Sequence, residues 1–134
     1  MTDLLPILTL TQRQHVFSRL VCRLIFQANY MGFDVQLGEA WRPPEMALIY
    51  AKAGKGIHDS LHCDRLAIDL NLFKGDQWLS SPSDYQPLGE WWEAQSTQQY
   101  RLVWGGRFRV HDDHGNLVPK PDAFHFSLSY DGRF

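Results

Sequence analysis

The stretch Leu66-Ala67-Ile68-Asp69-Leu70-Asn71-Leu72 alternates large apolar residues with small or polar ones, which is the two-residue period of a β-strand. Successive side chains of a strand point to opposite faces, so the leucines and the isoleucine share one face. Ala67, Asp69 and Asn71 share the other face. We therefore predict a strand over residues 66–73, with one face for the core and a polar face available for chemistry.

A second stretch near the C-terminus follows the same pattern. In Phe124-His125-Phe126-Ser127-Leu128-Ser129 the apolar side chains alternate with His125, Ser127 and Ser129. This alternation predicts a strand over residues 124–130 that again has a core face and a polar face. The polar faces of the two strands each carry one good metal ligand, Asp69 on the first strand and His125 on the second.

His62 lies a short loop before Asp69, close enough for a loop-to-strand turn to aim both side chains at one point. Two histidines and one carboxylate are a recognised zinc ligand set that leaves the fourth position for water. The spacing therefore makes His62, Asp69 and His125 candidate ligands of a Zn²⁺ site. The alternative is that these polar side chains are merely solvated, and four other histidines are alternative ligands: His15, His58, His111 and His114.

A rival cluster of ligand-type residues occurs in His111-Asp112-Asp113-His114-Gly115-Asn116. Asp, Gly and Asn are also the residues that tight turns prefer, because they tolerate left-handed backbone or bond to their own backbone. The composition therefore favours a solvated hairpin tip over a metal site in this segment.

Helical patterns surround the two strands. Thr11-Gln12-Arg13-Gln14 resembles a capping box, and Gly32 is a suitable C-terminal stop for the helix that follows it. A second helix opens at Pro43-Pro44 and closes at Gly54-Lys55-Gly56, and a third begins at Pro82-Ser83-Asp84. Apolar residues of the first helix repeat with the spacing of one helix face: Phe17, Leu20, Val21, Leu24 and Ala28.

Two further short strands, over residues 33–37 and 100–104, complete the pattern. Because helices and strands are interspersed without regular βαβ spacing, we predict an α+β fold with a small, mostly antiparallel sheet packed with helices. The chain contains no internal repeat and no linker-like segment. Residues 1–134 are therefore predicted to form a single domain.

Composition excludes several classes of function. The 134 residues include 13 Lys+Arg and 15 Asp+Glu, and the formal net charge of -2 argues against a nucleic-acid binder that works through a basic field. Apolar runs are far shorter than the ~20 residues of a membrane span. Met1-Thr2-Asp3-Leu4-Leu5-Pro6 lacks the basic and apolar regions of a secretory signal. We expect a soluble cytoplasmic monomer, in which Cys22 is a small buried core residue and forms no disulfide with Cys63.

Four segments, in order along residues 36–128, resemble the signature of one zinc peptidase family. Ser60-Leu61-His62-Cys63-Asp64-Arg65-Leu66-Ala67-Ile68-Asp69 resembles its Ser-x-His-x(6)-Asp motif, and Asp122-Ala123-Phe124-His125 resembles its second ligand motif. Trp104-Gly105-Gly106 and Glu39-Ala40-Trp41-Arg42-Pro43 resemble the Trp-Gly-Gly segment and the Arg-bearing turn. The family comprises D-alanyl-D-alanine carboxypeptidases and dipeptidases and L-alanyl-D-glutamate endopeptidases, including small bacteriophage endolysins.

The resemblance implies the zinc fold that D-Ala-D-Ala peptidases share with hedgehog-type domains, with His62, Asp69 and His125 as the Zn²⁺ ligands. It also implies that Asp122 is the general base and later the acid, and that Arg42 is the group that polarises the scissile carbonyl. Two further residues are implied to contact the substrate: Ser60 and Trp104. Without the resemblance, each of these four non-ligand residues has an ordinary structural interpretation, as a turn residue, a surface arginine, a loop cap and a core tryptophan.

The chain departs from the family pattern at two positions. Arg65 stands where many members have Gly, and Phe124 stands where Pro commonly precedes the second zinc histidine. Neither change removes a predicted ligand or the predicted base. The first leaves the subclass of substrate open.

From the resemblance we expect cleavage of the L-alanyl-D-glutamate bond in peptidoglycan stem peptides by a phage endolysin. Such an enzyme stays in the host cytoplasm until a holin opens the membrane. A D-Ala-D-Ala carboxypeptidase or dipeptidase is the alternative enzyme. A non-catalytic domain that uses zinc for stability and binds the cell wall is the alternative without catalysis.

Overall fold

Strand β2 (Ala67–Lys74) is the centre of the sheet in the structure, a computed structural model that describes residues 4–55 and 60–134. It pairs with β1 (Asp34–Leu37) along one edge. Along the other edge it pairs with β7 (His125–Leu128) and then with β3 (Gln77–Leu79), and β4 (Leu102–Trp104) follows β7. Every pair is antiparallel, which confirms the predicted sheet and fold class.

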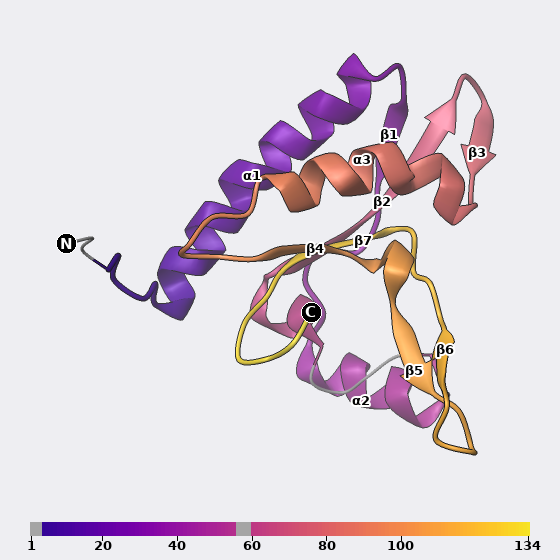
Figure 1. Cartoon of the computed structure of the whole chain (residues 1–134). Coiled ribbons are helices and arrows are strands. Elements are labelled where there is room, and N and C mark those ends of the chain that lie inside the picture. The colour runs from indigo at the N-terminus through magenta and orange to yellow at the C-terminus, as the bar shows by residue number, and fades with distance from the viewer. Residues whose placement is uncertain (1–3, 56–59) are drawn as a thin grey trace.

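Helices α1 (Leu10–Tyr30) and α3 (Pro82–Ala94) cover one face of this sheet (Figure 1). Trp92 of α3 is fully buried there, with its ring edge-on to Phe126 of β7 at 6.1 Å between ring centroids. The indole Nε1–H of Trp92 donates to the carbonyls of Val103 and Ser127, each at 3.2 Å, so the ring also ties α3 to two strands. The core therefore lies between the two helices and the apolar face of the sheet.

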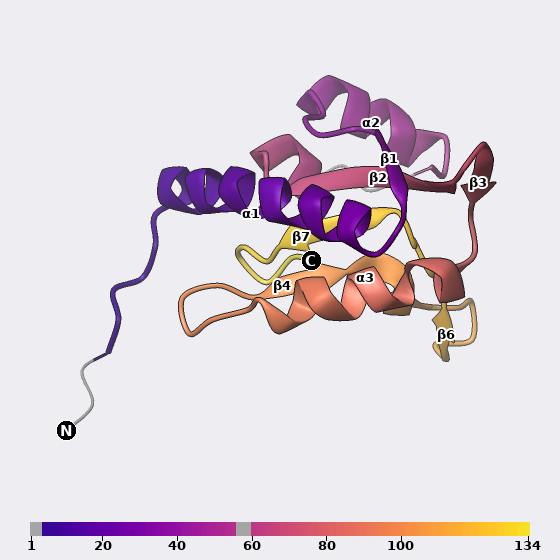
Figure 2. The same ribbon diagram turned by 90° about the horizontal axis from the view of Figure 1, so that it is seen from above.

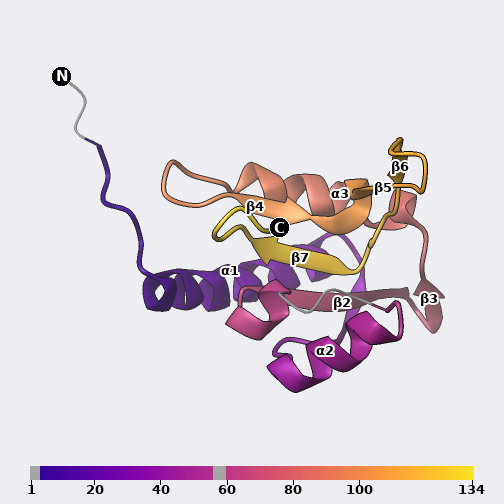
Figure 3. The same ribbon diagram turned by 90° about the horizontal axis from the view of Figure 1, so that it is seen from below.

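The remaining elements lie on the other side of the sheet (Figure 1). They are α2 (Pro44–Lys52) and the hairpin of β5 (Arg109–His111) and β6 (Leu117–Pro119). In the views from above and below, α2 lies nearer β2 and α3 lies nearer β4 (Figure 2, Figure 3). Two short 3₁₀ helices, η1 (Leu61–Asp64) and η2 (Gly105–Arg107), lead into the polar side of the sheet.

Two local predictions in the first helix are wrong. The helix is capped by Thr9, whose Oγ1 accepts from the Gln12 backbone N–H at 3.1 Å while the Gln12 side chain accepts from the Thr9 backbone N–H at 2.9 Å. Thr11 therefore lies inside the helix. Cys22 is exposed, because it lies off the buried stripe that the helix presents to the sheet: Phe17, Leu20, Leu24 and Ala28.

The predicted polar face of the last strand is also not open to solvent. His125 and Ser127 are buried together with their apolar neighbours Phe126 and Leu128. The strand lies between β2 and β4 and has protein over both faces, so its polar side chains must find partners inside the protein. None of the helices in residues 4–55 and 60–134 is long and apolar enough to span a membrane.

Candidate functional site

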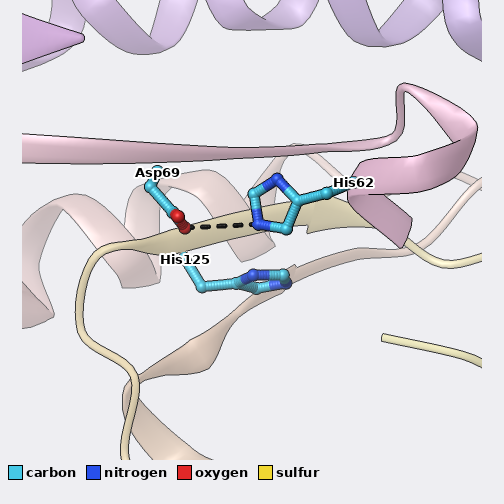
Figure 4. A group of neighbouring side chains, drawn as sticks. All are labelled: His62, Asp69 and His125. Carbon is cyan, nitrogen blue, oxygen red and sulfur yellow. Dashed lines mark ion pairs between the residues drawn. The ribbon is translucent and has the colours of Figure 1, made fainter. Parts of the chain in front are cut away.

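The pairing of β2 with β7 brings two of the predicted ligands together. Asp69 and His125 are directly opposite each other in this antiparallel pair, so their side chains share one face of the sheet. His62 reaches the same point from η1, and one donor atom from each of the three residues lies within 4.8 Å of the others (Figure 4). The structure thus places the three side chains where one ion could contact all of them.

The backbone around His62 fixes the direction of its imidazole. Ser60 is the N-cap of η1, and its Oγ accepts from the His62 backbone N–H at 3.2 Å. The ring Nδ1 lies 3.3 Å from the carbonyl oxygen of Ala40, a contact that requires a proton on Nδ1. The other ring nitrogen, Nε2, lies 3.4 Å from Asp69 Oδ1, and the two groups form an ion pair when the ring is protonated (Figure 4). A bond from the second ring nitrogen to a carbonyl is the usual support of a metal-binding histidine.

The 3₁₀ helix that carries His62 ends at Arg65 in a left-handed conformation, with φ 58°. Glycine is favoured there because it has no Cβ to clash with the backbone. This is the physical reason why a glycine suits the position of Arg65 in the resemblance described above. In this chain the Arg65 guanidinium lies over the Trp41 ring, 4.6 Å from its centroid, in a cation–π contact.

Two atoms of the group lack hydrogen-bond partners although they are buried. They are Asp69 Oδ1 and His125 Nε2, and in the described part of the chain only Ser129 Oγ shares this condition among side-chain atoms. A buried polar atom without a partner costs roughly 1–3 kcal/mol. Beside Asp69 Oδ1 lies His62 Nε2 at 3.4 Å, and this ion-pair contact needs a protonated ring. A cation at that point would satisfy these atoms, and the donor set fits zinc.

Burial keeps His125 neutral. Its side chain is 6% exposed, and burial, followed by the positive charge that His62 can carry, lowers the pKa of His125 to about 4. Metal binding needs the unprotonated ring, because a proton and an ion compete for the same nitrogen. His125 is therefore available as a ligand at neutral pH.

Asp122 lies on the loop that enters β7, beside the three possible metal ligands His62, Asp69 and His125, which we call the ligand group. Its backbone N–H donates to the Gly105 carbonyl at 2.8 Å, and its carboxylate accepts from the backbone N–H of Phe124. Although the residue reaches the surface, loss of hydration and then the negative charge of Asp69 raise the pKa of its carboxyl. The shift moves its pKa towards the range in which an acid–base group exchanges protons near neutral pH.

The segment from Trp104 to Gly106 holds this loop in place. Trp104 is 2% exposed, and its ring Nε1–H donates to the Ala123 carbonyl at 2.8 Å. A Cβ on Gly105 would lie 2.4 Å from the Asp122 carbonyl oxygen and 2.9 Å from His125 Cβ, so only glycine fits this approach. Trp104 is thus a core residue that positions the loop, and its contact with substrate stays a prediction.

Arg42 lies at the edge of the site, with its backbone N–H on the His62 carbonyl at 3.1 Å. Its guanidinium is bound to Glu39, with Nε 2.6 Å and Nη2 2.5 Å from Oε1 of that carboxylate. Its positive charge opposes part of the upward shift in the pKa of Asp122 and adds to the downward shift in the pKa of His125. The sequence analysis gave Glu39 no role of its own, although an acid three residues before Arg42 is a possible ion-pair partner.

The other predicted or alternative site residues lie elsewhere. Ser60 is buried and caps η1, and its substrate contact stays a prediction. His111 and His114 lie in the β5–β6 hairpin, whose turn is held by Asp112 Oδ1 accepting from the backbone N–H groups of His114 and Asn116 at 2.9 Å. In the described part of the chain neither they, nor His15, nor Cys63 belong to a group of three possible metal ligands. The remaining alternative, His58, lies outside the described residues.

Comparisons with known proteins identify the fold. No protein-family model and no curated protein sequence matches the chain. The structure is similar to the crystal structure of the L-Ala D-Glu endopeptidase ChiX of Serratia marcescens, with a TM-score of 0.57 and 16% sequence identity. The likeness covers 87% of this chain and 86% of that chain. It confirms the α+β fold, and the two chains share this fold.

Proposed function

We propose that this protein is a zinc-dependent peptidase that cleaves the L-alanyl-D-glutamate bond of peptidoglycan stem peptides. The observation that carries the proposal is that two buried atoms, Asp69 Oδ1 and His125 Nε2, have no hydrogen-bond partner and lie with His62 beside an acid with a raised pKa. The bond specificity is supported by the likeness to an L-Ala D-Glu endopeptidase and by the sequence resemblance described above.

In this proposal His62 Nε2, Asp69 Oδ1 and His125 Nε2 hold the ion. A zinc ion held by three protein ligands supplies Lewis acidity, which polarises a carbonyl and lowers the pKa of a water towards ~7. Asp122 takes a proton from the attacking water and delivers it to the leaving amine. Arg42 donates to the scissile carbonyl oxygen, since its five N–H donors exceed what the Glu39 carboxylate accepts.

Two substitutions separate the proposed roles. We expect Asp122→Asn to retain one zinc per chain and to lose about 10²–10⁴-fold in peptidase activity, because only proton transfer is removed. We expect His125→Ala to lose both zinc and activity. Zinc content is measured by metal analysis after dialysis, and activity by mass spectrometry of digested peptidoglycan.

His114→Ala is the matched control, because His114 lies in the distant hairpin and should leave zinc content and activity unchanged. Near-wild-type turnover in Asp122→Asn would refute its assignment as the base.

The mass spectrometry of digested peptidoglycan also identifies the bond that is cleaved. A new D-Glu amino terminus supports the proposal, release of free D-Ala indicates a carboxypeptidase, and zinc binding without any cleavage indicates a binding domain. The endolysin setting, release by a holin and the monomeric state stay predictions.

A further inference from the structure

An aromatic ring and two amides lie next to the ligand group on the same face of the sheet. Asn71 of β2 pairs with Gln36 of β1, and Phe73 of β2 pairs with Trp78 of β3. Side chains two residues apart on a strand share a face, so Asn71 lies on the face of Asp69, about 7 Å further along β2. We call Trp78, Asn71 and Gln36 the Trp78 platform.

The Trp78 ring is held rigidly although 52% of the residue is exposed. Its Nε1–H donates to Asn71 Oδ1 at 3.3 Å. One face of the ring stacks on Phe124, with 5.8 Å between ring centroids and 12° between the planes. Phe124 is fixed in turn by the buried Tyr85, edge-on at 5.3 Å. Because the ring is stacked on Phe124 and bonded at Nε1, its exposed part is preorganised and loses little entropy when it binds a ligand.

The chemistry of the platform fits a neutral sugar. An aromatic face carries negative charge density and attracts the weakly positive C–H hydrogens on the face of a pyranose ring. The amides of Asn71 and Gln36 are bonded to each other at 3.2 Å. Together they offer uncharged donors and acceptors, which match hydroxyl and acetamido groups. Apart from Asp69 of the ligand group, the next acid on this face is Asp34, which lies opposite Phe73 and one cross-strand pair further from that group than Asn71.

The spacing also fits the proposed substrate. In a stem peptide the L-alanine is attached through a lactyl group to muramic acid. One residue spans at most ~3.3–3.6 Å, so L-alanine and the lactyl group place the sugar ring about 7 Å from the scissile carbonyl. This is close to the step from Asp69 to Asn71, whose Oδ1 accepts from the Trp78 indole N–H. We propose that the Trp78 platform binds the muramic acid ring of peptidoglycan, an inference that rests on the proposed function.

Binding is tested without catalysis by following the indole N–H signals in NMR spectra of the wild-type protein. The probe is N-acetylmuramic acid joined to L-alanine methylamide, which lacks the scissile bond. We expect the Trp78 signal to shift saturably while those of the other four tryptophans stay in place. Absence of a shift overturns the proposal. So does an equal shift with alanyl-lysine amide, which would show a site for a cation between Trp78 and Asp34.

A second test compares cleavage of a muramyl tripeptide with cleavage of the same tripeptide without sugar. We expect kcat/KM of the wild type to favour the sugar-bearing substrate about three- to tenfold, the range expected for an aromatic contact. Trp78→Ala should abolish this preference, and Trp78→Phe should keep part of it. Phe26→Ala removes a comparably exposed aromatic from α1 and should leave the preference intact.

The two tests also separate this inference from the proposed function. If the muramyl probe shifts the Trp78 signal but no peptide bond is cut, the sugar site stands and the proposed function fails. If both substrates are cut at equal rates and the signal does not move, the sugar site fails and the peptidase stands.

Discussion

The unusual feature at the scale of single residues is that His125 is buried without a bond at Nε2. The folded protein accepts this cost and keeps the ring unprotonated, since burial and His62 lower the pKa of His125 to about 4. In an unfolded chain the same ring has a pKa of 6.5. The two states therefore differ in bound protons over a defined range of pH.

This difference predicts how the zinc-free protein responds to acid. Between pH 6.5 and about 4 the unfolded chain binds a proton at residue 125 that the folded chain does not, so stability falls as pH falls. The loss is about 3 kcal/mol when the full shift is expressed. Urea denaturation in the presence of chelator, measured at a series of pH values, should show it. His125→Asn should have a flatter profile, and parallel profiles for the two proteins would contradict the prediction.

At the scale of elements, the site depends on the contact between η2 and the loop before β7. Gly105 accepts the Asp122 backbone N–H at 2.8 Å, and the absence of a Cβ lets the two backbones approach. Trp104 supports the same contact, because its Nε1–H donates to the Ala123 carbonyl of the loop. These bonds determine where the acid and the last ligand enter the site.

Gly105→Ala should therefore disturb the site as well as the fold. The new Cβ would meet the Asp122 carbonyl and His125 Cβ, so the loop must move, and we expect a loss of about 1–3 kcal/mol in stability together with weaker zinc binding. Denaturation and zinc titration measure the two effects. Gly115→Ala is the control, because it strains a backbone with φ +78° in open space at the hairpin tip. That variant should lose stability only, and equal zinc affinity in both variants would argue against the role of Gly105.

At the scale of the whole molecule, the ligand group exists only when the fold is complete. His62 comes from η1 and Asp69 from the adjoining β2, whereas His125 comes from β7, which follows α3 and β4 along the chain. An ion that binds only the folded state stabilises it by mass action. In the proposed function, zinc binding and global stability would therefore be linked.

We expect zinc at a hundred times its Kd to stabilise the protein by about 2.7 kcal/mol, and chelation to reverse the gain. Thermal denaturation should show a rise in Tm of several degrees. The rise should persist in Asp122→Asn and be absent in His62→Ala. A Tm that does not respond to zinc would contradict the proposed ligand set.

The local period of the sequence was sufficient to predict the two strands and the face that carries Asp69. It was not sufficient to predict helix caps, burial and side-chain contacts that depend on packing. Thr9 and Thr11 both precede a glutamine by three residues, and only the position of the first helical turn decides that Thr9 is the cap. The burial of Ser127 and the contact of Glu39 with the Arg42 guanidinium depend on segments that meet only in the folded chain.

The direct pairing of Asp69 with His125 has a consequence for folding. A slip of β7 by a single residue along β2 would turn His125 to the opposite face and separate the ligands. Only one alignment of the two strands can hold the ion. A bound metal would therefore stabilise only chains in which β7 pairs with β2 in the correct register. Chains in which β7 is shifted by one residue would gain no stability from the metal.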